Sequence, residues 1–234
     1  MPGSASYAIL LLGTLLEALV VVCAVRRKVL KKYFVLNFYM LLCVFVSLGR
    51  YHILTHDGGV KSITYRYFYF YSDALLTIVL YFGLISLYIS VFEEMKVERY
   101  LRMGAIVLLA GTSWFSYAVV SQSSHRMLTY FAFELSQNLY FVGLILTYVL
   151  WAAVLKMRHT QALLVQLVLS LGIYFSAYAA SYSLSNLHPN FYSYVAYMVP
   201  VIGCLLPLSW AYAFWRVPEE ARLSPQRLAM AGSR

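Results

Sequence analysis

The stretch Ser6–Lys32, SYAILLLGTLLEALVVVCAVRRKVLKK, decides the fold class of this protein. It begins with an apolar run of about 20 residues, the length that a helix needs to cross a hydrocarbon core of about 30 Å. A basic cluster follows at once, and no Lys or Arg precedes it. A secretory signal peptide carries its positive charges before the apolar part. We therefore interpret the segment as a retained first transmembrane helix.

Similar apolar runs continue along the chain, and each is long enough to span a membrane. The seven runs are Ser6–Val25, Tyr33–Leu54, Tyr67–Phe92, Met103–Ser121, Leu128–Leu155, Gln161–Leu184 and Phe191–Trp215. They take up most of the 234 residues, of which 62% are hydrophobic. The sequence therefore predicts an all-α membrane protein, with one seven-helix transmembrane domain over residues 1–217 and a short cytoplasmic tail over residues 218–234.

The Lys and Arg residues divide unequally between the two sides of these runs. One side holds only Arg50, Lys61, Arg66 and Arg126 out of 18 basic residues. The other side holds Arg26, Arg27, Lys28, Lys31, Lys32, Lys96, Arg99, Arg102, Lys156, Arg158, Arg216, Arg222, Arg227 and Arg234. Positively charged loops stay in the cytoplasm. This predicts an N-terminus outside and a C-terminus inside, in a multi-pass protein of the cell membrane.

The net charge of +9 has the same explanation. Basic residues beside a membrane satisfy the topology rule and attract anionic lipid headgroups. We therefore expect membrane lipids as partners and no nucleic acid.

Acidic residues inside the runs are the strongest candidates for function. An ionised group in the bilayer costs a few kcal/mol, so it marks a functional site or a buried pair. Asp73, Glu134 and Arg50 share a similar depth in the outer third of the bilayer, whereas the acid Glu17 lies near the middle of the first run. We expect an ion trio with Arg50 between the two acids, within about 4 Å of each or bridged by one water, and with Tyr178 or Tyr182 nearby. The alternative is a structural network that fixes helix packing.

Polar residues at helical spacing extend these positions. The sixth run carries a stripe of Gln166, Ser170, Tyr174, Tyr178, Ser181 and Tyr182, and the fifth places Asn138 four residues after Glu134. Such stripes should turn away from lipid. The predicted ligand-binding residues are Arg50, Asp73, Glu134, Asn138, Tyr178 and Tyr182. Pro200 and Pro207, two turns apart in the last run, should bend or locally open that helix.

Known seven-helix classes do not fit the residues. A microbial rhodopsin holds retinal on a lysine of its last helix, and Phe191–Trp215 contains none. Glu98-Arg99-Tyr100 matches the acid-Arg-Tyr triplet of rhodopsin-class G-protein-coupled receptors, but the last run lacks Asn-Pro-x-x-Tyr. Catalytic motifs of serine hydrolases and zinc proteases are absent, and the cysteines and histidines are scattered. We therefore expect a non-enzymatic protein with no cofactor and no metal.

One group of proteins does show similar features. The chain resembles uncharacterised bacterial seven-helix membrane proteins in Glu17, the Arg26-Arg27-Lys28 cluster, the tyrosine-rich start of the third run, and Trp215-x-x-Pro218-Glu219-Glu220-Ala221. The resemblance covers most of the chain. It implies the seven-helix fold and no activity.

The function that these features favour is the binding or sensing of a small ligand in the outer half, with a signal passed through the last helix to a cytoplasmic partner. Two alternatives remain open. The protein is an accessory subunit of a larger membrane complex, with a protein partner in the membrane, or it is an intramembrane lipid-modifying enzyme or transporter.

The predicted orientation has a direct test. Single cysteines at Gly58 and Ser224, in a variant without Cys23, Cys43 and Cys204, are treated on intact cells with an impermeant thiol reagent. We expect labelling at position 58 and none at position 224, because the charge distribution places position 58 outside. Labelling only at position 224 reverses the orientation.

Overall fold

The computed structural model describes residues 4–56, 62–93, 98–121, 127–156, 161–187 and 192–218. In these ranges the chain forms seven helices, each long and apolar enough to span a membrane. They are α1 (Ser4–Arg26), α2 (Phe34–His56), α3 (Ile63–Val91), α4 (Glu98–Ser121), α5 (Met127–Lys156), α6 (Ala162–Leu187) and α7 (Tyr192–Arg216). The predicted seven-helix fold is confirmed. The predicted tail lies almost entirely outside the described residues.

Two helices begin about a turn earlier than the apolar runs predict. The helix α3 starts at Ile63 rather than Tyr67, and α4 starts at Glu98 rather than Met103. In α4 the first turn is stabilised by an ion pair between Glu98 and Arg102, one turn apart, with the acid at the positive end of the helix dipole. Polar residues can thus continue a helix beyond the apolar part, which a search for apolar runs does not detect.

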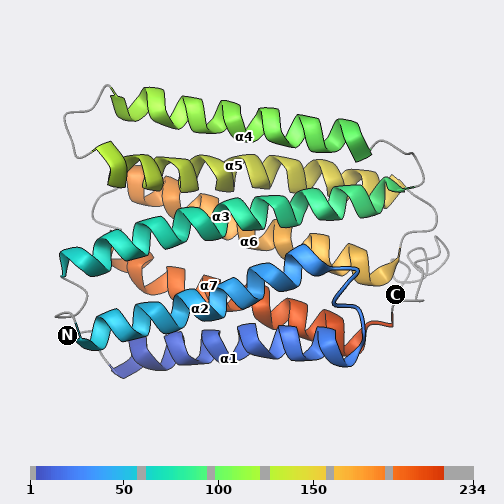
Figure 1. Ribbon diagram of the computed structural model, residues 1–234, viewed down its shortest axis with the longest axis horizontal. Coiled ribbons are helices and arrows are strands. Elements are labelled where there is room, and N and C mark those ends of the chain that lie inside the picture. Colours follow the sequence, from blue (N-terminus) through green and yellow to red (C-terminus); the bar gives the residue numbers. More distant parts are fainter. Residues whose placement is uncertain are drawn as a thin grey trace, which may run out of the picture.

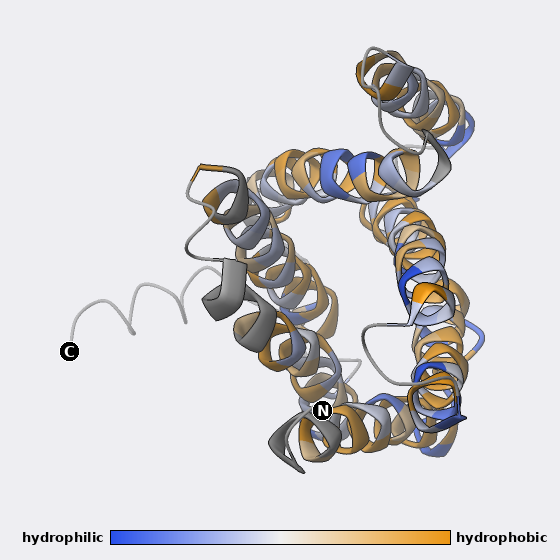
Figure 2. Cartoon of the chain, turned by 90° about the vertical axis from the view of Figure 1, so that its left-hand side faces the viewer, coloured by the Kyte–Doolittle hydropathy of each residue, from blue (hydrophilic) through white to orange (hydrophobic). Residues whose placement is uncertain are grey.

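The helices form a ring with one helix outside it. Neighbouring contacts run in the order α1, α2, α3, α5, α6, α7 and back to α1, while α4 packs on α5 and more lightly on α3 (Figures 1 and 2). The two ends of this bundle differ in charge. We call the end where α1 starts the amino-terminal end. The end where α1 finishes is the basic end, since it carries the residues from Arg26 to Lys32.

Several buried hydroxyls in the interior are satisfied within their own helix. The hydroxyls of Thr77, Ser116, Thr147 and Ser170 are all buried, and each donates to the backbone carbonyl four residues earlier in its own helix. Large apolar side chains such as Leu15 cover the outside of the bundle. This pattern suits a lipid environment, where no water is available to satisfy a buried polar group.

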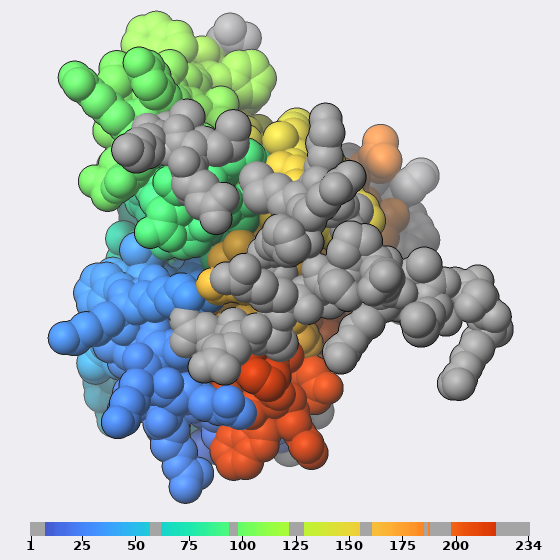
Figure 3. Space-filling model, turned by 90° about the vertical axis from the view of Figure 1, so that its right-hand side faces the viewer, coloured from blue at the N-terminus to red at the C-terminus, as the bar shows by residue number. Residues whose placement is uncertain are grey.

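The ring closes where α1 meets α7 at the basic end (Figure 3). The helix α1 ends in a Schellman motif: the N–H of Val29 donates to the carbonyl of Ala24, and Lys28 has a φ of 60°. This turn leads the chain directly towards α2. It leaves Arg27 beside α7, where the guanidinium donates to the carbonyl of Trp215 at the end of that helix. A cation at a helix C-terminus is favourable because the last carbonyls carry partial negative charge.

The last helix is continuous through Pro200 and Pro207. The predicted local opening is therefore not seen in the backbone of α7. The thiol of Cys204 donates to the carbonyl oxygen of Pro200 at 3.4 Å, one turn earlier in the same helix.

Close packing between α5 and α6 generates a testable prediction. A Cβ placed on Gly143 would lie 2.5 Å from the ring of Phe175, whereas a Cβ on Gly111 of α4 meets nothing within 4 Å. We expect Gly143→Ala to destabilise the protein by about 1–3 kcal/mol, because the buried Phe175 must move. Thermal unfolding in detergent, followed by circular dichroism, measures this. Gly111→Ala is the matched control and should unfold as the parent does. Equal stability of the two variants would contradict the packing described here.

Candidate functional site

Charged and hydroxyl groups meet inside the ring towards its amino-terminal end. They come from three helices: Arg50 on α2, Asp73 on α3 and Tyr182 on α6. Counted along their helices at 1.5 Å per residue, they lie about 9, 15 and 8 Å from the nearest helix end at that side. We call this group, with the residues that contact it, the polar site.

Arg50 is half-buried and held by α3. Its guanidinium donates to the hydroxyl of Ser72 at 3.0 Å and lies over the ring of Tyr69, 4.5 Å from the ring centre. The hydroxyl of Ser72 in turn donates to the backbone carbonyl of Tyr69. Residues 69 and 72 are three apart and therefore share one face of α3. The Nε of Arg50 is buried and has no hydrogen-bond partner within the described ranges.

Asp73 is also half-buried, and its partners are neutral. The hydroxyl of Tyr182 donates to its Oδ2 at 3.4 Å. The buried hydroxyl of Ser136, on α5, lies near the same carboxylate. Arg50 and Asp73 attract each other electrostatically, but their charged atoms are not within 4 Å of each other in the described part of the chain. The two opposite charges thus share one interior without an ion pair.

Four tyrosines pack beside these charges. Tyr140 of α5 stacks on Tyr178 of α6, with ring centres 4.6 Å apart and ring planes 12° apart. Tyr174 lies 4.6 Å from Tyr178, and Tyr182 lies 5.7 Å from Tyr140. We call these four residues the tyrosine cluster. On the far side, the hydroxyl of Tyr178 is 3.7 Å from where a Cβ of Gly203 in α7 would stand, so the cluster reaches from the polar site to α7.

Glu134 and Asn138 lie elsewhere. Asn138 donates to the hydroxyl of Ser116 at 3.0 Å and therefore faces α4, outside the ring. Glu134 is one turn earlier on the same face of α5, and no hydrogen bond or ion pair joins it to Arg50 or Asp73 among the described residues. The expected ion trio is thus not formed. Glu134 was grouped with Arg50 and Asp73 by its depth along the helix. The rotation of α5 about its axis, however, turns Ser136 and Tyr140 inward and the face that carries Glu134 and Asn138 towards α4.

Glu17 lies between α1 and α2. The hydroxyl of Ser47 donates to its Oε2 at 3.2 Å. Ser47 is three residues before Arg50 and shares its side of α2. Glu17 therefore lies on the side of α2 that faces the polar site, and Arg50 and Glu17 attract each other electrostatically. The bond gives this acid a neutral hydrogen-bond partner on the neighbouring helix.

Several residues of the polar site were not among the predicted ones. Tyr69, Ser72 and Ser136 hold or approach the two charges, and Ser47 connects to Glu17. A signal existed for some of them, because Ser72 adjoins Asp73 in sequence and Ser47 precedes Arg50 by nearly one turn. Serine inside a transmembrane run is common, however, and by itself does not indicate a site.

Neither metals nor known relatives indicate a chemistry. Within the described residues, no group of three or more His, Cys, Asp and Glu side chains is placed to hold a metal ion. A scan of protein-family models, a search of curated proteins and a search of solved structures each found no match to this chain. The site therefore has to be interpreted from its own geometry.

A double-mutant cycle tests the electrostatic link within the polar site. Arg50→Gln and Asp73→Asn should each destabilise the protein, because each leaves one half-buried charge without its opposite. The double variant should recover part of that loss, with a coupling free energy of about 0.5–3 kcal/mol. Thermal or denaturant unfolding in detergent measures it. Strictly additive losses would show that the two charges do not interact.

Proposed function

We propose that this protein binds a small zwitterionic ligand in the polar site and passes the binding event through α7 to a cytoplasmic partner. The orientation is the one that the basic residues predict, so the amino-terminal end faces outward and the polar site lies in the outer half of the membrane. The protein acts without catalysis in this proposal.

The observation that carries the proposal is the unpaired state of two opposite charges. Arg50 and Asp73 face one interior from adjacent helices, and their partners are hydroxyl groups and an aromatic ring rather than each other. Placing charges in a membrane protein without pairing them is costly. A ligand with an anionic group towards Arg50 and a cationic group towards Asp73 would satisfy both. Such a ligand would also give the buried Nε of Arg50 an acceptor.

The tyrosine cluster supports the proposed route to α7. Tyr182 bonds to Asp73 at one side of the cluster, and Tyr178 reaches Gly203 at the other. A ligand that takes the place of Tyr182 at Asp73 would shift stacked rings that press on α7 between its two prolines. Protein interiors are closely packed, so a displaced side chain shifts its neighbours. The far end of α7 is the basic end, where a cytoplasmic partner would meet it.

Thermal unfolding of the purified protein in nanodiscs of neutral lipid tests the proposal. The probes are amino acids and betaines as zwitterions, matched with simple carboxylates and simple amines that carry only one of the two charges. We expect a zwitterion to raise the melting temperature more than either single-charge class. A ligand at a hundredfold excess over its Kd stabilises by about 2.7 kcal/mol.

Matched variants decide whether the polar site is responsible. Arg50→Gln and Asp73→Asn should each remove the stabilisation. Arg102→Gln and Glu98→Gln remove one positive and one negative charge at the exposed first turn of α4. These two variants should still be stabilised by the zwitterion. The proposal fails when no zwitterion stabilises the protein, or when the stabilisation persists in both polar-site variants.

One observation favours the accessory-subunit alternative. The helix α4 lies outside the ring and exposes several aromatic side chains, with Trp114 73% and Phe115 60% exposed. Its buried residues are Ala105, Thr112, Ser116 and Val120, none of which is large. The exposed face would suit another transmembrane helix. Photo-crosslinking from position 114 in cells distinguishes the alternatives, because a subunit gives a discrete protein adduct and a stand-alone sensor gives lipid adducts.

A further inference from the structure

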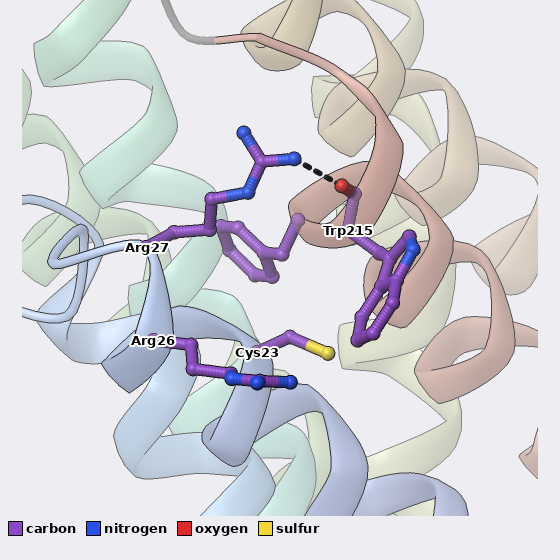
Figure 4. Close-up of a pocket in the computed structure, with 5 residues that line it drawn as sticks. Cys23, Arg26, Arg27 and Trp215 are labelled. Atoms are coloured by element: carbon purple, nitrogen blue, oxygen red, sulfur yellow. Dashed lines mark hydrogen bonds between the residues drawn. The ribbon is translucent and has the colours of Figure 1, made fainter.

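A pocket opens at the basic end, on the seam where the ring closes. It lies between α1 and α7, has a volume of about 390 Å³, and is lined by Cys23, Arg26, Arg27, Phe214 and Trp215 (Figure 4). The lining of the pocket is apolar at its base and charged at its rim. Cys23 and Phe214 are buried, with 2% of each side chain exposed, whereas both arginines and Trp215 are exposed at the rim. None of the five lining residues is acidic.

The two arginines differ in how they are held. Arg27 donates to the carbonyl of Trp215, which fixes its guanidinium at the mouth of the pocket (Figure 4). This bond uses one of the five N–H groups that a guanidinium carries. Arg26 makes no hydrogen bond or ion pair with the part of the chain that the structure describes. Both groups therefore keep donors for an anion, and a guanidinium fork matches the geometry of a phosphate.

The depth of the pocket indicates where that anion comes from. The apolar spans of α1 and α7 end at Arg26 and Arg216, so the pocket lies where hydrocarbon gives way to headgroups. Trp215 is 52% exposed there, a position typical of the aromatic residues that line membrane interfaces. A free anion would use the two arginines alone. A phospholipid would also place its glycerol and upper acyl carbons against Phe214 and Trp215.

We propose that this pocket binds the phosphate group of an anionic phospholipid, held by Arg26 and Arg27. The site is independent of the polar site, which lies towards the other end of the bundle. A lipid bound here would contact α1 and α7 together and would add to the single bond from Arg27 that joins their ends. Anionic lipid would thus strengthen the closure of the ring.

Delipidated protein in a neutral detergent provides the test. Phosphatidylglycerol is titrated in, bound lipids are counted by native mass spectrometry, and the melting temperature is followed. Phosphatidylcholine and inorganic phosphate are titrated in parallel. We expect one phosphatidylglycerol to be retained and the melting temperature to rise, with smaller effects from phosphatidylcholine and from inorganic phosphate.

The variants separate a built site from diffuse attraction. Arg26→Gln keeps the bond between Arg27 and Trp215 and should weaken phosphatidylglycerol binding about fivefold. Arg26→Lys keeps the positive charge but lacks the guanidinium fork. Its affinity for phosphatidylglycerol should lie between those of Arg26→Gln and the parent. Lys31→Gln removes an exposed charge at the same end, outside the pocket, and should bind as the parent does.

Three results would overturn the proposal. Equal weakening by Lys31→Gln and Arg26→Gln would mean that lipid is attracted by net charge alone. Equal binding of phosphatidylcholine and phosphatidylglycerol would remove the role of the anionic headgroup. A rise in melting temperature with inorganic phosphate as large as that with phosphatidylglycerol would make the pocket a small-anion site.

Discussion

Closure of the ring between α1 and α7 is the contact on which the rest of the structure depends. Without it, the faces of α1, α2 and α3 that carry Glu17, Arg50 and Asp73 would be open to lipid, where charged groups are costly. With it, these residues share an interior with hydroxyl groups and tyrosine rings. The closure is made by packing along both helices and is supplemented at the basic end. There the turn after α1 places Lys28 at a positive φ, and Arg27 bonds to the end of α7.

The interior combines two kinds of interaction that respond differently to change. Most buried hydroxyls bond to their own helix, so they are satisfied whatever the neighbouring helices do. Bonds that cross between helices involve Glu17, Arg50 and Asp73. Others join neutral groups, such as Tyr81 to the carbonyl of Ala105 and Tyr88 to the carbonyl of Leu146. Movements between helices would therefore alter the surroundings of Arg50 and Asp73 and leave the hydroxyls bonded within one helix unchanged. This separation allows a stable backbone to coexist with an adjustable site.

The sequence predicted the helices well and the site in part, for a physical reason. The length of an apolar run is a local property, and it located all seven helices in the described residues. Depth is also local, and it grouped Arg50, Asp73 and Glu134, of which Arg50 and Asp73 lie close enough to interact electrostatically. Rotation about the helix axis is not local. Each helix is apolar on most sides, so the pattern does not identify its inner face, and Asn138 of α5 bonds to Ser116 of α4 instead of entering the polar site. The exclusion of α4 from the ring was not predicted either, because an apolar run indicates the length of a helix and not its neighbours.

The joining of α1 to α7 also bears on how the protein is made. The two residues of the Arg27–Trp215 bond are 188 positions apart. At a translation rate of about 5–20 residues per second, roughly 10–40 s pass between the synthesis of the first and that of the second. During this time α1 and α2 are already in the membrane, and Glu17 has Ser47 but not the remaining wall of the ring. The polar groups of the early helices therefore need contacts with the insertion machinery or with each other until α7 is made. The Glu17–Ser47 bond lies within the first hairpin, so it can form before the later helices are synthesised.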